Sequence, residues 1–214
     1  MGLQLRVAMP DQPGALARIT QAIAQVGVDV MSVSVLESDG GRAIDDIRLR
    51  WPDGRSTTEL VSVVSGLRGV DLLGCRRTRW LLDGRPELDL LTYLIAVPER
   101  GIETLVDMAP TVLDADWAEL RAPAKRFPAL HLSGPTAHDH RAPAAMPVRA
   151  CAFLDERGSW AHLPMPSLHS VLVIGREEGP AFLRAELAHA ERVLELATRT
   201  IARLREPSAV SASA

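Results

Sequence analysis

The sequence has few cysteines, few aromatic residues and no excess of one charge. Its 214 residues include two cysteines, Cys75 and Cys151, which lie far apart and share no C-x-x-C spacing. They are therefore expected to be free thiols, not a disulfide framework or a zinc site. Twenty-four Lys and Arg against 27 Asp and Glu give a formal charge of −3. This balance disfavours a nucleic-acid-binding protein, which would carry a basic surface.

Long apolar runs are also missing. No stretch reaches the ~18 apolar residues of a membrane-spanning helix, and the first ten residues lack the basic start and apolar run of a signal peptide. We therefore expect a cytoplasmic protein with no membrane partner. The composition, 47% hydrophobic and 24% charged, is that of a globular protein, and the length suits one large domain or two small ones.

The first eighty residues predict an α+β unit. Leu3 to Met9 alternates apolar and polar residues, as in a strand with one buried face. An apolar repeat of three and four residues then predicts an amphipathic helix that ends at Gly27, capped by Asp11 or Gln12. The remaining elements are a hairpin of two half-buried strands within 28–37 and 47–51, a second helix up to Gly66 and a strand over 70–76. The first hairpin strand should bury Met31, Val33 and Val35. This order of elements is ferredoxin-like, βαββαβ.

One segment of this unit resembles a known family. The run Asp11-Gln12-Pro13-Gly14-Ala15-Leu16, followed by Val28-Asp29-Val30 at the start of the second strand, is similar to the D-x-P-G-x-L loop and the following turn of the ACT domain. The resemblance implies a regulatory module over residues 1–84. Such a module typically binds an amino acid where two copies pair side by side in a shared sheet.

The physical chemistry of the same residues fits that implication. Free N–H groups of Gly14, Ala15 and Leu16 at the positive end of a helix can receive a carboxylate, and Asp11 can meet an ammonium group. The alternative is structural: Asp11 caps the helix, Pro13 begins it and Gly14 eases the turn, with no ligand involved.

The second half, residues 85–205, resembles a GAF domain. The resemblance is carried by Leu113-Asp114-Ala115-Asp116-Trp117-Ala118-Glu119-Leu120 and by Val171-Leu172-Val173-Ile174-Gly175 with the helix after it. It implies an α+β domain with an antiparallel sheet and flanking helices. We expect a helix with the apolar stripe Leu88, Leu91, Leu94 and Ile95, followed by a second helix that Pro110 bends or divides. Strands are expected over 116–121, 129–132, 148–154, 159–163 and 171–175, and a last helix over 180–204. Residues 206–214 are expected to be a disordered tail.

Three groups of side chains in the second half could carry chemistry. His138-Asp139-His140 could bind a divalent metal, although a solvated cluster is the stronger interpretation in a loop rich in Ala and Pro. His131, His162 or His169 could pair with Ser133, Ser167 or Ser170, but no nucleophile motif accompanies them. Trp117 and Trp160 belong to the core or to the mouth of a pocket, and we favour the core. No phosphate-binding glycine motif is present, so we expect no cofactor, no metal and no enzyme activity.

The leading hypothesis is a non-catalytic regulatory protein, a homodimer that binds an amino acid or similar effector through Asp11, Gln12, Pro13, Gly14, Ala15, Leu16, Val28, Asp29 and Val30. Two alternatives remain open. The chain could be a ligand-independent dimerisation and protein-interaction module, or its GAF-like half could sense the small molecule.

Overall fold

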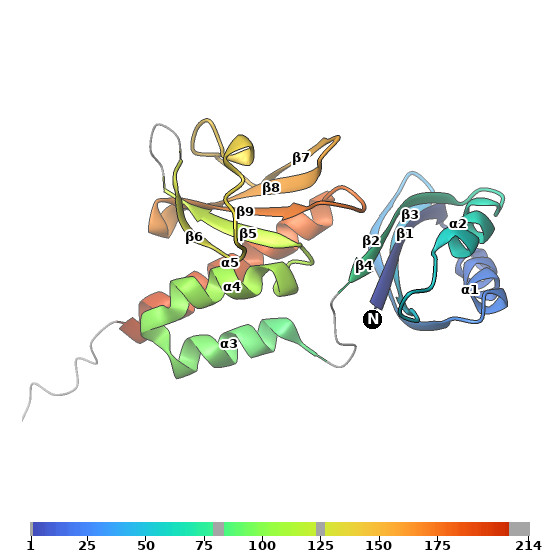
Figure 1. Cartoon of the computed structure of the whole chain (residues 1–214), viewed down its shortest axis with the longest axis horizontal. Helices are drawn as coiled ribbons and strands as arrows, with labels where there is room; N and C mark the ends of the chain where they lie inside the picture. Colours follow the sequence, from blue (N-terminus) through green and yellow to red (C-terminus); the bar gives the residue numbers. More distant parts are fainter. Residues whose placement is uncertain (1, 79–83, 123–126, 206–214) are drawn as a thin grey trace, which may run out of the picture. The chain divides into compact units, whose positions relative to one another are not determined.

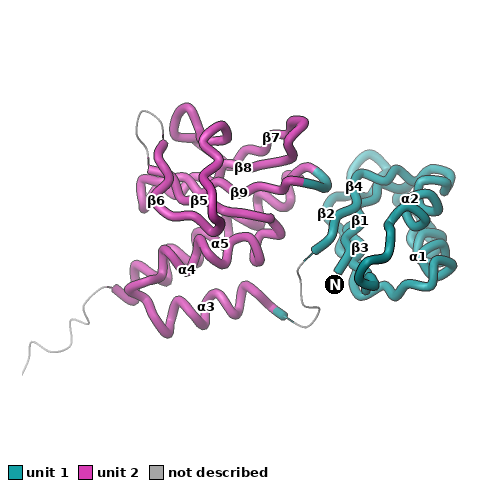
Figure 2. The backbone as a smooth tube through the Cα atoms, in the orientation of Figure 1, with its two compact units in different colours: residues 1–84, 178–180 teal, residues 85–177, 181–214 magenta. Residues whose placement is uncertain are grey.

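The computed structural model describes residues 2–78, 84–122 and 127–205, and the predicted tail over 206–214 lies outside them. The chain forms two compact units (Figure 2): Met1–Gly84 with Glu178–Pro180, and Arg85–Glu177 with Ala181–Ala214. Among the described residues, no helix combines the length and the apolar character that crossing a bilayer requires.

The first unit has the expected ferredoxin-like order. Its elements are β1 (Gly2–Pro10), α1 (Ala15–Gln25), β2 (Asp29–Asp39), β3 (Arg42–Arg50), α2 (Thr58–Ser65) and β4 (Asp71–Thr78). The strands form one antiparallel sheet in the order β2-β3-β1-β4. Both helices cover the same face of this sheet (Figure 1), so the α+β prediction is confirmed.

The two faces of β1 are buried in different ways. Leu5 packs against the helices through Ile19 and other members of the apolar core. The opposite face carries Arg6, whose guanidinium donates two hydrogen bonds of 2.7 Å to the Asp46 carboxylate, and Gln4, which donates to the same carboxylate at 2.6 Å. The expectation that β1 has only one buried face is therefore wrong, because its polar face is buried as an ion-pair network.

Two local predictions in the first unit are also wrong. In the described part of the chain no side chain caps α1, since the N-cap is Gly14, whose left-handed backbone (φ +86°) makes the entry turn. β2 does not bury a continuous apolar face, because bulges at Met31 and Leu36 shift its register against β3. Val35, which pairs in regular register with Asp45, is nevertheless 66% exposed on this edge strand.

The second unit contains three helices and a five-stranded antiparallel sheet in its described residues. The elements are α3 (Pro86–Ala96), α4 (Gly101–Val112), β5 (Trp117–Arg121), β6 (Ala129–Leu132), β7 (Cys151–Asp155), β8 (Gly158–Met165), β9 (Ser170–Arg176) and α5 (Arg184–Arg205), with short 3₁₀ turns at Pro98–Arg100, Asp139–Arg141 and Pro166–Leu168. The sheet order is β6-β5-β9-β8-β7. The helices lie on one face (Figure 1), and the main core fills the space between them and the sheet.

The opposite face of the second sheet carries a smaller apolar cluster. Trp117 is buried there with Phe127 and Val173. A Cβ at Gly175, the partner of Trp117 on β9, would lie 2.0 Å from Cζ2 of the indole. Only glycine therefore lets the indole lie across this strand.

The helices of the second unit depart from two predictions. α3 buries Leu94 as predicted, and also Leu90, whereas Leu88 and Ile95 are 55% and 62% exposed, so the predicted stripe is wrong at these two positions. α4 continues through Pro110 to Val112 without being divided. Pro110 has no N–H to donate to the carbonyl of Val106, yet the helix continues for two more residues.

Candidate functional site

The loop between β1 and α1 is open at its glycine. Gly14 has no heavy atom within 4 Å of the position that a Cβ would take, and Asp11 to Gly14 are exposed. The Ala15 amide donates to the carbonyl of Gln12 at 3.2 Å, so one of the three amides expected to receive a ligand is already used. The amides of Gly14 and Leu16 have no acceptor among the described residues. These two N–H groups, at the positive end of α1, remain available to an anion.

A carboxylate missed by the sequence analysis lies in the same unit. Asp45 pairs with Val7 of β1 on the apolar face of the sheet, and only 3% of the residue is exposed. Within the described residues its side chain makes no hydrogen bond or ion pair, and its Oδ1 is fully buried. Burial, followed by the negative charges of Asp11 and Asp46, raises the pKa of the Asp45 carboxyl.

Asp11 places a second carboxylate near Asp45. Its Oδ2 accepts a 2.6 Å hydrogen bond from the Ser38 hydroxyl, and its backbone N–H donates to the carbonyl of Gly41 at 2.9 Å. These bonds tie the loop to the end of the β2-β3 hairpin. The result is an acidic pair, Asp11 and Asp45, beside an open loop with two free amides. A cation would relieve the repulsion between the two carboxylates.

The other predicted ligand residues lie at the opposite end of the sheet. Asp29 pairs with Arg50, which pairs with Gly2 at the start of β1, whereas the Asp11 loop follows Pro10 at the end of β1. At about 3.3 Å per residue, the length of β1 separates them by roughly 25 Å. One copy of the chain therefore does not bring Val28, Asp29 and Val30 to the Asp11 loop.

The second unit contains a cavity of about 390 Å³. Its wall is formed by the loop of residues 140–147 together with Cys151 and Phe153 of β7 and Trp160 and His162 of β8. Phe153 stacks on Trp160 with ring centroids 5.4 Å apart. The preference for Trp160 as a core residue is thus wrong, whereas Trp117 is in the core as expected.

A buried ion pair holds the loop that forms this wall. Arg121 of β5 donates through Nε to Glu119 at 2.9 Å and through Nη1 to Asp139 at 2.9 Å. The Glu119 carboxylate also accepts from the backbone N–H of His138 at 2.6 Å and from its ring Nδ1 at 2.5 Å. The His138 ring stacks on Trp117 at 3.9 Å.

These contacts decide the role of the histidine cluster. His138 binds Glu119, Asp139 binds Arg121, and His140 lines the cavity, so the structure does not gather the three side chains around one metal position. The favoured interpretation, a solvated cluster, is also wrong for His138, because its ring is stacked and hydrogen-bonded.

The proposed histidine and serine pairs are not formed either. His131 bonds to Asp107 at 2.8 Å, and His162 donates from Nε2 to the carbonyl of Arg141 at 2.7 Å. Ser133 and Ser170 donate to backbone carbonyls. In the part of the chain that the structure describes, none of these serines is hydrogen-bonded to a histidine.

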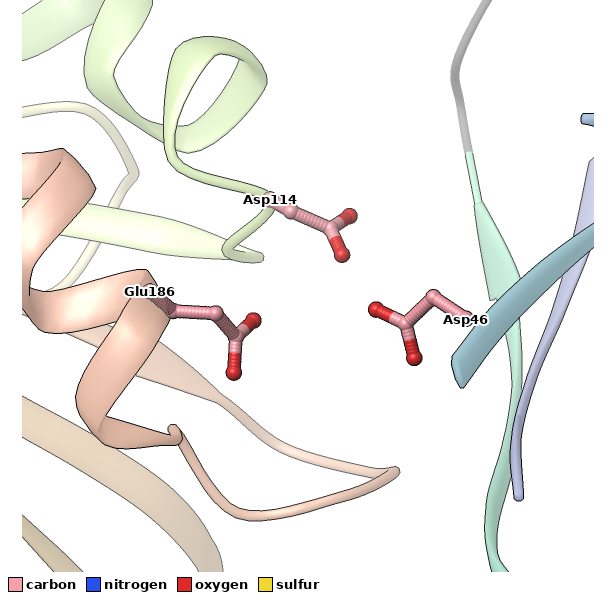
Figure 3. Close-up of side chains that lie close together, drawn as sticks. All are labelled: Asp46, Asp114 and Glu186. Carbon is pink, nitrogen blue, oxygen red and sulfur yellow. The ribbon is translucent and has the colours of Figure 1, made fainter. Parts of the chain in front are cut away.

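Three other carboxylates form ion pairs with arginines of their own units. In the second unit, Glu186 in the first turn of α5 accepts from Arg176 at 2.6 Å, and Asp114 lies 3.4 Å from the same guanidinium. Figure 3 draws these two carboxylates together with Asp46, which belongs to the first unit and pairs there with Arg6. We therefore assign these acids a structural role.

The comparison with known protein families supports the resemblance of the first unit to the ACT domain. Residues 3–50 match the family model of the ACT domain. No curated protein matches the sequence. A formyltetrahydrofolate deformylase from Pseudomonas putida KT2440 is similar in structure over 45% of this chain, at 14% identity and a TM-score of 0.30, and this chain spans only 38% of that protein. An unknown protein from Galdieria sulphuraria is similar over 96% of this chain and 91% of its own, at 13% identity and a TM-score of 0.34.

Proposed function

We propose that this chain is a non-catalytic regulatory protein that binds an amino acid through its ACT domain. The observation that carries the proposal is the buried Asp45 carboxylate, which has no partner among the described residues and lies near Asp11. An unpaired buried carboxylate costs free energy, and a bound cation would recover that cost. The motif Asp11 to Leu16 is the second support.

The two ends of an amino acid match two kinds of group in this loop. Its ammonium group would lie between the carboxylates of Asp11 and Asp45. Its carboxylate would accept from the amides of Gly14 and Leu16 at the beginning of α1, where the helix dipole favours negative charge. The open space at Gly14 would admit the Cα and side chain of the ligand.

The proposal includes a homodimer, because one copy leaves the site incomplete. β2 is an edge strand of its sheet, and an exposed edge is a template for pairing with another chain. If β2 pairs antiparallel with β2 of a second copy, the start of one strand lies beside the end of the other. Asp29 of each copy would then approach the Asp11 loop of its partner.

The second unit is proposed to be a GAF-like domain that reports the bound state. Its support is the antiparallel sheet with β9 and α5 in the places that the resemblance implied. A ligand that binds one arrangement of the dimer more tightly shifts the population toward it by its difference in affinity.

The experiment is a thermal-shift screen of the full chain against the twenty amino acids, followed by calorimetry with any that binds. Ligand at 100 times its dissociation constant should add about 2.7 kcal/mol of stability. Asp45→Asn, which keeps the shape and removes the charge, should abolish the shift. Asp53→Asn, an exposed acid in the turn after β3, is the matched control and should leave it unchanged.

The outcomes of this screen distinguish the proposed site from its alternatives. A shift from one amino acid that Asp45→Asn removes supports the site. Binding that Asp45→Asn leaves intact moves the ligand away from this loop and contradicts the proposal. A dimer in sedimentation velocity with no shift from any amino acid favours the alternative, a ligand-independent interaction module.

A further inference from the structure

The cavity of the second unit has a buried positive charge on its wall. Arg141 is 3% exposed, and its guanidinium lies between two indoles, 5.4 Å from the ring centroid of Trp117 and 5.2 Å from that of Trp160. Its Nη2 donates to the backbone carbonyl of Arg157, and its Nε has no acceptor in the part of the chain that the structure describes. Among the described residues, no carboxylate pairs with it.

The carboxylates near Arg141 bind other partners. Glu119 is shared between Arg121 and His138, and Asp139 accepts from Arg121. Asp155 accepts from the backbone of the exposed hairpin turn of β7 and β8. A buried cation without a counter-ion is costly, even when aromatic rings flank it. The protein therefore holds Arg141 at a position where an anion from solution would be stabilised.

The rest of the wall is apolar, aromatic and neutral. Phe153 stacks on Trp160, and the His162 ring lies 4.8 Å from Phe153. Burial lowers the pKa of His162, and loss of hydration followed by the charge of Arg141 lowers that of His140. Both imidazoles are therefore uncharged at neutral pH. Burial also raises the pKa of the Cys151 thiol, so no thiolate opposes an anion.

We propose that this cavity binds a small aromatic monocarboxylate, with its carboxylate on Arg141 and its ring against Phe153 and Trp160. The volume lies within the roughly 300–1,000 Å³ of small-molecule sites. One positive charge balances one negative charge, whereas a phosphate dianion would leave a charge uncompensated between apolar walls. The carboxylate, which only accepts hydrogen bonds, also suits the Nε of Arg141 and the indole N–H of Trp160, which are both donors without acceptors among the described residues.

The test uses the reactivity of Cys151, which lines the cavity. The full chain is treated with a neutral maleimide, and labelling of each cysteine is followed by peptide mass spectrometry. Cys75 belongs to the first unit and is the internal control. The probes are 2-naphthoate, its neutral analogue 2-naphthamide, acetate and inorganic phosphate. We expect 2-naphthoate to slow labelling of Cys151 and not of Cys75.

The role of the Arg141 charge is tested by substituting this arginine and, as a control, Arg157. Arg141→Gln should weaken protection by 2-naphthoate about ten- to a hundredfold, and the amide should bind more weakly than the acid by a similar factor. Arg157→Gln keeps the backbone carbonyl that Arg141 uses and should retain full protection. If Arg141→Gln fails to fold, the comparison of acid with amide on the unaltered chain still decides the question.

Three results would overturn the inference. Equal protection by acid and amide would mean that the cavity recognises only the ring. Protection by phosphate as strong as by 2-naphthoate would mean that the site prefers a dianion. Absence of protection by 2-naphthoate at millimolar concentration would mean that the cavity does not bind this class of ligand. Each result is independent of amino-acid binding at the Asp11 loop.

Discussion

Asp45→Asn should make the unliganded protein more stable while it removes ligand binding. The native carboxylate is buried, lacks a partner among the described residues and faces the charges of Asp11 and Asp46. Replacing a buried, unpaired charged group by a neutral group of the same shape should recover about 1–3 kcal/mol at neutral pH. Each kcal/mol shifts the Tm of a domain of 60–100 residues by about 4–8 °C, so even the lower bound is measurable.

The stability gained by Asp45→Asn depends on pH, and the direction of this dependence can be predicted. The pKa of Asp45 is raised in the folded protein above its ordinary value of 3.8, so the folded state holds the proton more tightly than the unfolded state. The stabilisation from that proton is fully present below pH 3.8 and is lost as the pH rises through the folded pKa. The difference between Asp45→Asn and the unaltered protein should therefore be largest at neutral pH and should vanish toward pH 3.8.

The assay is urea unfolding of both proteins at several pH values between 4 and 7, with Asp53→Asn as the control. A variant that is less stable than the unaltered protein at pH 7 would refute the reasoning, because the carboxylate would then have a stabilising partner. A gain that does not shrink at low pH would also refute it, since the effect would not come from ionisation.

Three further outcomes follow from particular contacts. Val35→Lys places an ammonium group across from the Asp45 carboxylate on β3. It should raise the free energy of unfolding in urea by about 0.2–1 kcal/mol, and its ammonium should compete with amino-acid binding in calorimetry. Gly175→Ala should destabilise the second unit by at least about 1–3 kcal/mol in thermal unfolding, because its Cβ would collide with Trp117. Glu119→Gln should cost about 3–5 kcal/mol in urea, because it leaves Arg121 buried without its main counter-charge.

The fold of the first unit was predictable because each signal is local. The alternation in β1, the apolar repeat in α1 and the glycine after it depend on near neighbours in the sequence. The exposed Val35 was not predictable in this way. Val35 lies on β2, which is an edge strand with a neighbour on one side only, and the order of strands in a sheet is decided by tertiary pairing.

The candidate site was predictable only in part. The loop of Asp11 to Leu16 follows from its motif, but Asp45 was overlooked. A signal for it exists, because the alternation of Ile47, Leu49 and Trp51 continues back to position 45 and places an acid on the buried face. The cavity of the second unit had no such signal. The cavity wall is held by hydrogen bonds from Arg121 to Asp139 and from the His138 N–H to Glu119. These bonds join segments that are distant in the sequence, so no local pattern indicates them.

The register of the first sheet has a consequence for mixtures of variants. Asp29 and the Asp11 loop lie at opposite ends of one sheet, so in the proposed dimer each site takes one end from each copy. A dimer formed from one chain with Asp45→Asn and one with Asp29→Asn would contain one site with both changes and one site with neither. Two binding-deficient proteins, mixed in equal amounts and allowed to exchange subunits, form mixed dimers as half of all dimers. They should therefore regain about a quarter of the binding capacity, with the affinity of the unaltered protein.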